Sequence, residues 1–296
     1  GEPQSARAGS GVVASRRFLV LLGLVIVAVL AYAAVLRNLD LTAIPVEQDF
    51  GAKPDIARRV NVYLEPLSVD PVSQAMQMRV DVAPGPALRG ARPDAPDREL
   101  AVILSTGDAV EVLGFRAGEH MAPATIRPDL NDGRIVDYPL DRYRVGLRLR
   151  AAEGAGSGGP PIAMRVTVWE GVLGYAIRSS EATQGKDGEL DLRFDVRRTD
   201  AQVFFALAAY GAMAVLACTS LGISFLMFLG RRKAEATLIG GLAALVFALP
   251  ALRNALPGAP PLGVRADLAV FLWAELAVVI GIALAALSWA RRDPPH

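Results

Sequence analysis

Four long apolar runs constrain the fold of this chain more than any other feature. They cover residues 18–36, 203–229, 237–252 and 267–289. An α-helix rises about 1.5 Å per residue, so about 20 apolar residues cross the roughly 30 Å of hydrocarbon in a bilayer. A mean hydropathy of +0.34 over 296 residues is also too apolar for an ordinary soluble domain. The runs predict one transmembrane helix near the N-terminus and three near the C-terminus.

The first and third runs each leave an alternative open. Arg16 and Arg17 precede the first run, as in a signal peptide, but the run is longer than the usual apolar region of about 7 to 15 residues. We therefore expect an uncleaved signal anchor. The third run is the shortest, so a re-entrant hairpin is the alternative to a span. The chain starts at Gly1 rather than Met, so we expect a missing or processed N-terminus, and we predict that residues 1–17 are a disordered cytoplasmic tail.

Basic residues indicate the orientation of the runs. Those at 16–17, 231–233 and 291–292 fall on one side if all four runs cross a membrane. Cytoplasmic loops carry an excess of Lys and Arg. We therefore expect a multi-pass protein of the plasma (inner) membrane, with both termini in the cytoplasm. Residues 40–201 and the 253–266 loop are expected on the outer side.

The segment between the first two runs has the pattern of a β domain. Val60, Val62 and Leu64 alternate with polar or aromatic residues, as in half-buried strands. The predicted strands are 60–65, 76–82, 100–105, 110–115, 143–149, 162–169 and 190–196. Gly- and Pro-rich segments separate them, which is typical of exposed loops. The pattern predicts an antiparallel β-sandwich over residues 40–201.

Few residues offer a catalytic or metal-binding group. Cys218 is the only cysteine and lies in an apolar run, and His120 and His296 are far apart. Residues 129–133 faintly resemble a calcium loop but lack the distal Glu, so a turn is the better interpretation. We predict no metal site, no cofactor and no catalytic residue. The overall net charge is +1, but residues 40–200 carry 25 acidic and 20 basic residues, and this mildly acidic balance of the β domain argues against nucleic acid as a partner.

Glu275 is the charged residue that a membrane span tolerates least. It lies about eight residues inside the fourth run, where an unpaired carboxylate costs on the order of 2–3 kcal/mol. We expect it to face other helices, and Arg253 is the predicted partner because it lies at the outer end of the third run and is the nearest cation by depth. One interpretation is a proton, cation or lipid headgroup site, and the other is a polar contact between helices.

Two stretches carry a family pattern. The first is Tyr138-Pro139-Leu140-Asp141-Arg142-Tyr143. The second is Leu249-Pro250-Ala251-Leu252-Arg253-Asn254, continuing through residues 257–263, with Pro257, Pro260 and Pro261, to Asp267. Together with one span before the β domain and three after it, they resemble the bacterial and fungal membrane family known as domain of unknown function 4436, in which Phe is expected at the position of Leu140. The resemblance covers nearly the whole chain after the tail, and it implies no activity.

The first stretch also has a physical interpretation. Pro139 presets a turn in which Asp141 can accept backbone hydrogen bonds, with Tyr138 and Tyr143 packed beside it. This indicates a rigid corner between strands. We expect the corner to dock on the loop at residues 253–265.

These observations favour a non-enzymatic envelope protein that binds or scaffolds through its outer β domain. The expected partners are the lipid bilayer and either another envelope protein or further copies of the chain. The alternative is a transport or channel subunit that uses Glu275, although no inverted repeats or broken helices are evident. A membrane enzyme is a third, less favoured reading.

Overall fold

The computed structural model describes most of the chain from residue 46 onward. The described residues are 23, 26–27, 29–34, 37, 46–51, 57–107, 109–156, 158–184 and 188–292. The chain divides into two units, Gly1–Ile44 and Pro45–His296. In the first unit the described residues are helical, within or next to the predicted span 18–36. The rest of that span and the predicted tail 1–17 lie outside the described residues.

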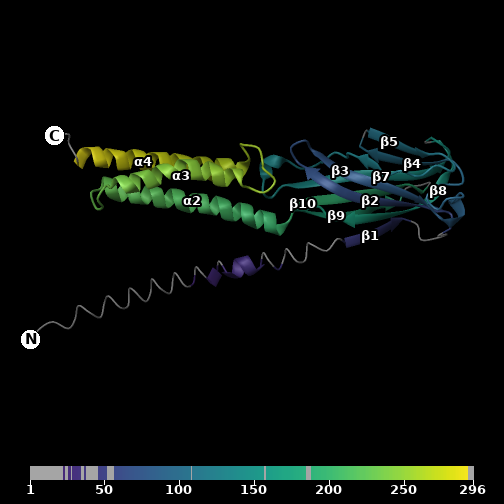
Figure 1. Cartoon of the computed structure of the whole chain (residues 1–296), viewed down its shortest axis with the longest axis horizontal. Helices are drawn as coiled ribbons and strands as arrows, with labels where there is room; N and C mark the ends of the chain where they lie inside the picture. Colours follow the sequence, from purple (N-terminus) through teal and green to yellow (C-terminus); the bar gives the residue numbers. More distant parts are fainter. Residues whose placement is uncertain are drawn as a thin grey trace, which may run out of the picture. The chain divides into compact units, whose positions relative to one another are not determined.

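The second unit begins with a mixed β-sheet domain (Figure 1). Its strands are β1 (Val46–Gly51), β2 (Arg59–Asp70), β3 (Ala75–Pro84), β4 (Leu100–Thr106), β5 (Ala109–Phe115), β6 (Ala124–Ile126), β7 (Arg142–Glu153), β8 (Pro161–Glu170), β9 (Tyr175–Gln184) and β10 (Leu190–Arg198). They pair in the order β5-β4-β7-β8-β2-β3-β6, with β1 on β8 and with β10 between β7 and β9. The domain is therefore nearly closed, like a barrel.

One pairing corrects the prediction of a purely antiparallel domain. β2 and β8 run parallel, with Val62 opposite Val166. Strands joined by a tight hairpin must be antiparallel, but five other strands separate β2 from β8 along the chain. Their relative direction is therefore set by the whole topology, which local periodicity does not encode. Among the described residues, β7 and β8 pair through Ala151–Ile162 and Ala152–Pro161.

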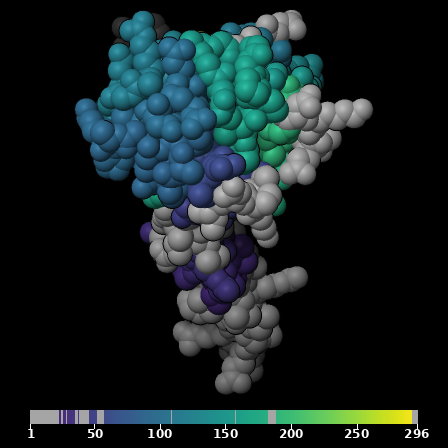
Figure 2. Space-filling model, turned by 90° about the vertical axis from the view of Figure 1, so that its right-hand side faces the viewer, coloured from purple at the N-terminus to yellow at the C-terminus, as the bar shows by residue number. Residues whose placement is uncertain are grey.

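The alternation of the predicted strands correctly identifies the core. All seven predicted strands are present, as β2, β3, β4, β5, β7, β8 and β10. Inward-facing residues of both sides, among them Val62, Val80, Val145 and Phe194, are fully buried in one cluster. In Figure 2, which faces the end of the domain away from the helices, blue atoms of its first half lie beside teal atoms of its second half.

Three strands have no clear alternating pattern and are absent from the prediction. β6 has three residues, which is too short for a periodic signal. β1 lies at an edge and β9 pairs only with β10, and both contain polar residues on both faces.

Three apolar helices follow the β domain. They are α2 (Asp200–Phe228), α3 (Ala236–Asn254) and α4 (Leu272–Arg292), and α4 follows a short π-helical turn, η4 (Asp267–Phe271). All three are long and apolar enough to cross a membrane. α3 is one continuous helix rather than a hairpin. Gly281 of α4 lies against α2, since a Cβ added there would be 3.1 Å from the hydroxyl oxygen of Ser220.

The last strand leads almost directly into the first of these helices. β10 ends at Arg198, and Thr199 caps α2 by accepting a hydrogen bond from the backbone N–H of Gln202 at 3.4 Å. Figure 1 shows that the helices leave the β domain at the end where β10 finishes. This end of the domain holds the predicted corner.

Candidate functional site

The predicted corner lies between the β domain and the helices. It follows the short helical turn η2 (Ile135–Asp137) and ends where β7 begins. Its Tyr138–Pro139 peptide bond is cis. Tyr138, Asp141 and Tyr143 are each about 2% exposed, whereas Leu140 points to the surface. The corner therefore buries its polar side chains.

A buried ion pair connects this corner to the last strand. Arg198, at the end of β10, donates from Nε to Oδ1 of Asp141 at 2.6 Å. The hydroxyl of Tyr143 donates to the other carboxylate oxygen at 2.8 Å. The Arg198 and Asp141 side chains are 1% and 0% exposed. Removing one partner would leave a charge buried and unpaired, so the pair requires both residues.

Aromatic rings complete the surroundings of Arg198. Its guanidinium carbon lies 4.6 Å from the ring centre of Tyr138 and 5.4 Å from that of Tyr175. Within the described part of the chain, Nη2 is buried without a hydrogen-bond partner. Burial raises the pKa of Tyr138 to about 12. Burial, together with the hydrogen bond to Asp141, also raises the pKa of Tyr143. Both hydroxyls are therefore neutral at physiological pH.

The loop between α3 and α4 lies on this corner. The hydroxyl of Tyr138 donates to the carbonyl of Pro257 at 3.1 Å. Gly258 has a φ of +75°, and a Cβ there would lie 2.6 Å from Nη1 of Arg198. Arg265 forms an ion pair with Asp137, with 2.5 Å between Nη1 and Oδ1. The predicted docking of the corner on this loop is confirmed.

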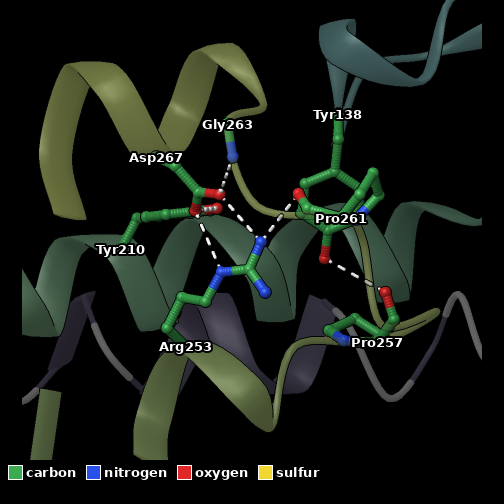
Figure 3. A network of polar contacts seen from close by, with 7 residues as sticks. All are labelled: Tyr138, Tyr210, Arg253, Pro257, Pro261, Gly263 and Asp267. Carbon is green, nitrogen blue, oxygen red and sulfur yellow. Dashed lines mark hydrogen bonds and ion pairs between the residues drawn. The ribbon is translucent and has the colours of Figure 1, made fainter. Parts of the chain in front are cut away.

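A second buried ion pair closes the loop from the helix side (Figure 3). Arg253 donates to both oxygens of Asp267, from Nε at 3.2 Å and from Nη2 at 2.8 Å. Asp267 also accepts from the Tyr210 hydroxyl at 2.7 Å and from the Gly263 backbone at 3.1 Å. Arg253 Nη2 further donates to the Pro261 carbonyl at 2.8 Å. One carboxylate thus joins α2, the end of α3, the loop and η4.

The predicted partner of Arg253 is therefore wrong. Arg253 is buried at the end of α3, but it pairs with Asp267 rather than with Glu275. Asp267 lies only 14 residues after Arg253, so closing the short loop brings the two together. Glu275 lies two turns further along, in α4, and its Oε2 is buried without a hydrogen-bond partner among the residues that the structure describes.

The prolines of the loop have different roles. Pro257 and Pro261 present carbonyl oxygens to Tyr138 and Arg253 respectively. Pro260 is buried and makes no side-chain hydrogen bond, as its ring has no donor.

We refer to the two ion pairs and the residues that hydrogen-bond to them as the junction network.

Sequence reasoning missed several members of this network. Arg198 follows Leu190, Leu192, Phe194 and Val196 at the inward-facing positions of its strand, so alternation was a signal that its side chain is buried. Tyr210 lies within an apolar run, where a lone tyrosine is ordinary. Asp267 begins the fourth run and ends the second family stretch. A carboxylate at the start of a span was the available signal of a buried polar contact.

A cavity on the outward face of β2, β3 and β8 is a separate feature. It encloses about 470 Å³ and is lined in part by Tyr63, Trp169, Glu65 and Arg79. Tyr63 pairs with Thr167 of β8, so Trp169, two residues on, projects from the same face. Tyr63 and Trp169 are 41% and 47% exposed. We call this the aromatic cavity.

The histidine considered from sequence lies in the wall of this cavity. His120 Nδ1 is 2.7 Å from Oδ2 of Asp94, in a loop. Within the described residues, no group of three His, Cys, Asp or Glu side chains is placed to hold a metal ion.

Two family models divide the chain at the junction. The model described as Domain of unknown function (DUF4436) matches residues 50–197. The model described as Domain of unknown function (DUF8686) matches residues 198–292. No curated protein matches the chain. The boundary between the two matches falls next to Arg198, so the junction network contains residues from both.

Proposed function

The chain belongs to the family of domain of unknown function 4436, and we propose that it is a non-enzymatic membrane protein of the cell envelope that binds or scaffolds a partner through its β domain. In this proposal four helices cross the membrane, counting the predicted span 18–36. Both termini lie in the cytoplasm and residues 40–201 lie outside it. The basic residues at 231–233 and 291–292, at the helix ends away from the β domain, support this orientation.

The junction network is the observation that carries the proposal. A β domain that only had to stay attached to the membrane would need no more than a flexible linker to the helices. Here Asp141 and Asp267 hold buried arginines on opposite sides of one loop, and Tyr138 hydrogen-bonds to that loop. Buried hydrogen bonds between charged groups favour a single arrangement, and within the described residues the two carboxylates of this network are paired at both oxygens. The β domain is therefore held at a fixed height and orientation, which suits recognition of another envelope component.

The aromatic cavity supplies the surface for recognition. Exposed tyrosine and tryptophan rings are typical of binding sites, since they bury a large area for few rotatable bonds. The cavity has the size of a small-ligand or peptide side-chain pocket. Its wall carries paired charges, among them Arg79 with Asp81 at 3.1 Å, which can orient a polar partner.

The carboxylates of the junction network argue against an enzyme. Asp267 accepts four hydrogen bonds, two of them from Arg253, and Asp141 accepts two, one of them from Arg198. A general base must be within reach of a substrate proton and able to accept it. Neither of these carboxylates meets that requirement.

Purification from the native membrane tests the proposal. The tagged full-length protein would be isolated in mild detergent and its co-purifying components identified by mass spectrometry. We expect a reproducible component that is lost with Trp169→Ala and kept with Val112→Ala, which removes an equally exposed apolar group from β5. Loss of the component with both variants, or its absence from the wild type, would refute binding through this cavity.

A transport or channel subunit is the second candidate. Glu275 Oε2 and the hydroxyls of Ser220 and Ser224 are buried without hydrogen bonds within the described residues. Unsatisfied polar groups inside an apolar bundle favour a proton or ion site. Ion or proton flux in proteoliposomes, abolished by Glu275→Gln and kept by Glu235→Gln in the exposed cap of α3, would favour this alternative.

A further inference from the structure

A second cavity lies on the other side of the β domain, at its end next to the helices. It encloses about 590 Å³ between β7, β9 and β10. Four arginines line it, Arg142, Arg144, Arg178 and Arg197, together with Asp132 and Asp195. We call it the arginine cavity.

Strand pairing explains how the arginines come together. Arg142 of β7 lies opposite Arg197 of β10. In the next row on the same face, Arg144 lies opposite Asp195, which lies opposite Arg178 of β9. Two neighbouring rows of three strands thus carry all four side chains. Like charges placed directly opposite one another destabilise a sheet. The stability of the fold therefore does not explain why Arg142 and Arg197 lie opposite each other.

Two of the four arginines lack a counter-ion. Arg144 lies 3.4 Å from Asp195 and 3.6 Å from Asp132. Arg197 pairs with Asp200 at 2.6 Å. Within the described part of the chain, the side chains of Arg142 and Arg178 make no ion pair or hydrogen bond. Both are exposed, and both line the cavity.

The position of the cavity indicates what anion reaches it. Arg197 lies three residues before the first residue of α2, and the apolar part of α2 begins at Val203. The two rows of arginines span about 7 Å along the strands. The headgroup layer on each side of a bilayer is of similar thickness, since about 30 Å of a total of about 40–45 Å is hydrocarbon. The cavity therefore lies at headgroup depth when α2 crosses the membrane.

We propose that the arginine cavity binds the phosphate of an anionic phospholipid headgroup, through Arg142 and Arg178. The planar guanidinium fork matches phosphate oxygens in a bidentate way. Arg142 and Arg178 lie two strands apart, about 10 Å in the sheet, so their long side chains can converge on one phosphate from opposite walls. The lipid would fix the base of the β domain against the membrane surface. This inference rests on the proposed membrane setting, but not on the proposed partner.

Lipid retention by the full-length protein tests this site. The protein would be reconstituted in nanodiscs of phosphatidylcholine with a minor share of phosphatidylglycerol, and the lipids that stay bound after release would be identified by native mass spectrometry. We expect enrichment of phosphatidylglycerol in the wild type and its loss in the double variant Arg142→Gln, Arg178→Gln. The double variant Arg148→Gln, Arg193→Gln removes the same charge from the same sheet face outside the cavity and should keep the enrichment.

Three outcomes would overturn the inference. One is equal enrichment in both double variants, which would indicate a non-specific charge effect. A second is no enrichment in the wild type. The third is a thermal stabilisation by inorganic phosphate alone, in neutral detergent, that equals the one from phosphatidylglycerol, because the site would then take free phosphate. Both leaflets of a nanodisc carry the same lipids, so the result does not depend on topology. The nanodiscs contain no native partner, so failure of the lipid site and failure of partner binding are recognised separately.

Discussion

Arg253 and Asp267 form two hydrogen bonds, of 3.2 and 2.8 Å, across the loop that joins α3 to α4. The same loop supplies the carbonyl of Pro257 to Tyr138 of the β domain. A loop fixed from inside the helices is therefore also the surface on which the β domain rests. The docking of the β domain on the helices depends on these two attachments of the loop.

The first prediction concerns the partner of Arg253. A double-mutant cycle with Arg253→Met and Asp267→Asn should give a coupling energy of at least about 1 kcal/mol, since the residues share hydrogen bonds. The cycle of Arg253→Met with Glu275→Gln should give a coupling near zero. Thermal unfolding in detergent would supply the free energies. A larger coupling to Glu275 would restore the partner expected from sequence.

The second prediction concerns the buried pair of Arg198 and Asp141. Asp141→Asn should lower the free energy of unfolding by about 3–5 kcal/mol, because a buried arginine loses its counter-charge. The control is Asp191→Asn, which breaks an exposed pair with Arg148 of similar length, 2.7 Å. That variant should change the free energy by less than about 1 kcal/mol. Equal effects of the two variants would show that Arg198 is not buried as described.

The third prediction separates backbone strain from contact in the loop. Gly258 and Gly263 both have positive φ, but only at Gly258 would a Cβ approach another group, the guanidinium of Arg198. Gly263→Ala should cost about 1–2 kcal/mol from the backbone alone. Gly258→Ala should cost more, since Arg198 is held by Asp141 and cannot move aside. If the two variants unfold at the same temperature, the loop does not rest on Arg198.

The fourth prediction is an alkaline loss of stability that depends on Tyr138. The unfolded state releases this proton near the ordinary pKa of 10.0, and the folded state only near about 12. The stabilisation is thus fully present below pH 10 and is lost as the pH rises from 10 to about 12, by on the order of 2–3 kcal/mol. Tyr138→Phe should be less stable by about 1 kcal/mol at pH 8, since it lacks the hydrogen bond to Pro257.

The pH series itself tests this explanation. Tyr138→Phe should lose stability less steeply than the wild type between pH 10 and 12. Tyr143 and Tyr175 also have raised pKa values and titrate in both proteins, so the comparison isolates Tyr138. Parallel slopes would mean that the Tyr138 hydroxyl is accessible to solvent in the folded state.

Periodicity identified seven of the ten described strands and the three C-terminal helices, but not the way in which the strands pair. The apolar runs near the C-terminus gave α2, α3 and α4, and alternation gave seven strands, because both signals lie within one segment. The parallel contact of β2 with β8 joins segments about 100 residues apart, with Arg59 opposite Ala163. No local pattern records such a pairing.

The same limit applies to the site. Pro139 and Asp141 predict a corner, and the 253–265 loop was expected to lie against it. Alternation along β10 places Arg198 on the inward face, but its partners could not be identified, because they come from three segments that meet only in the folded chain, namely the corner, the start of β9 and the loop. The predicted pairing of Glu275 with Arg253 was wrong because depth along a helix does not give the direction in which a side chain points.

The most direct test of the central claim is crosslinking between the corner and the loop in native membranes. In a Cys218→Ser background, Asp137→Cys and Arg265→Cys would be joined by a short bifunctional maleimide and the linked peptides identified by mass spectrometry. The control pairs Glu119→Cys with Arg265→Cys, because Glu119 follows β5 at the end of the domain away from the helices. We expect a link between 137 and 265 and none between 119 and 265. Equal linking of both pairs, or of neither, would contradict a β domain docked on the α3–α4 loop.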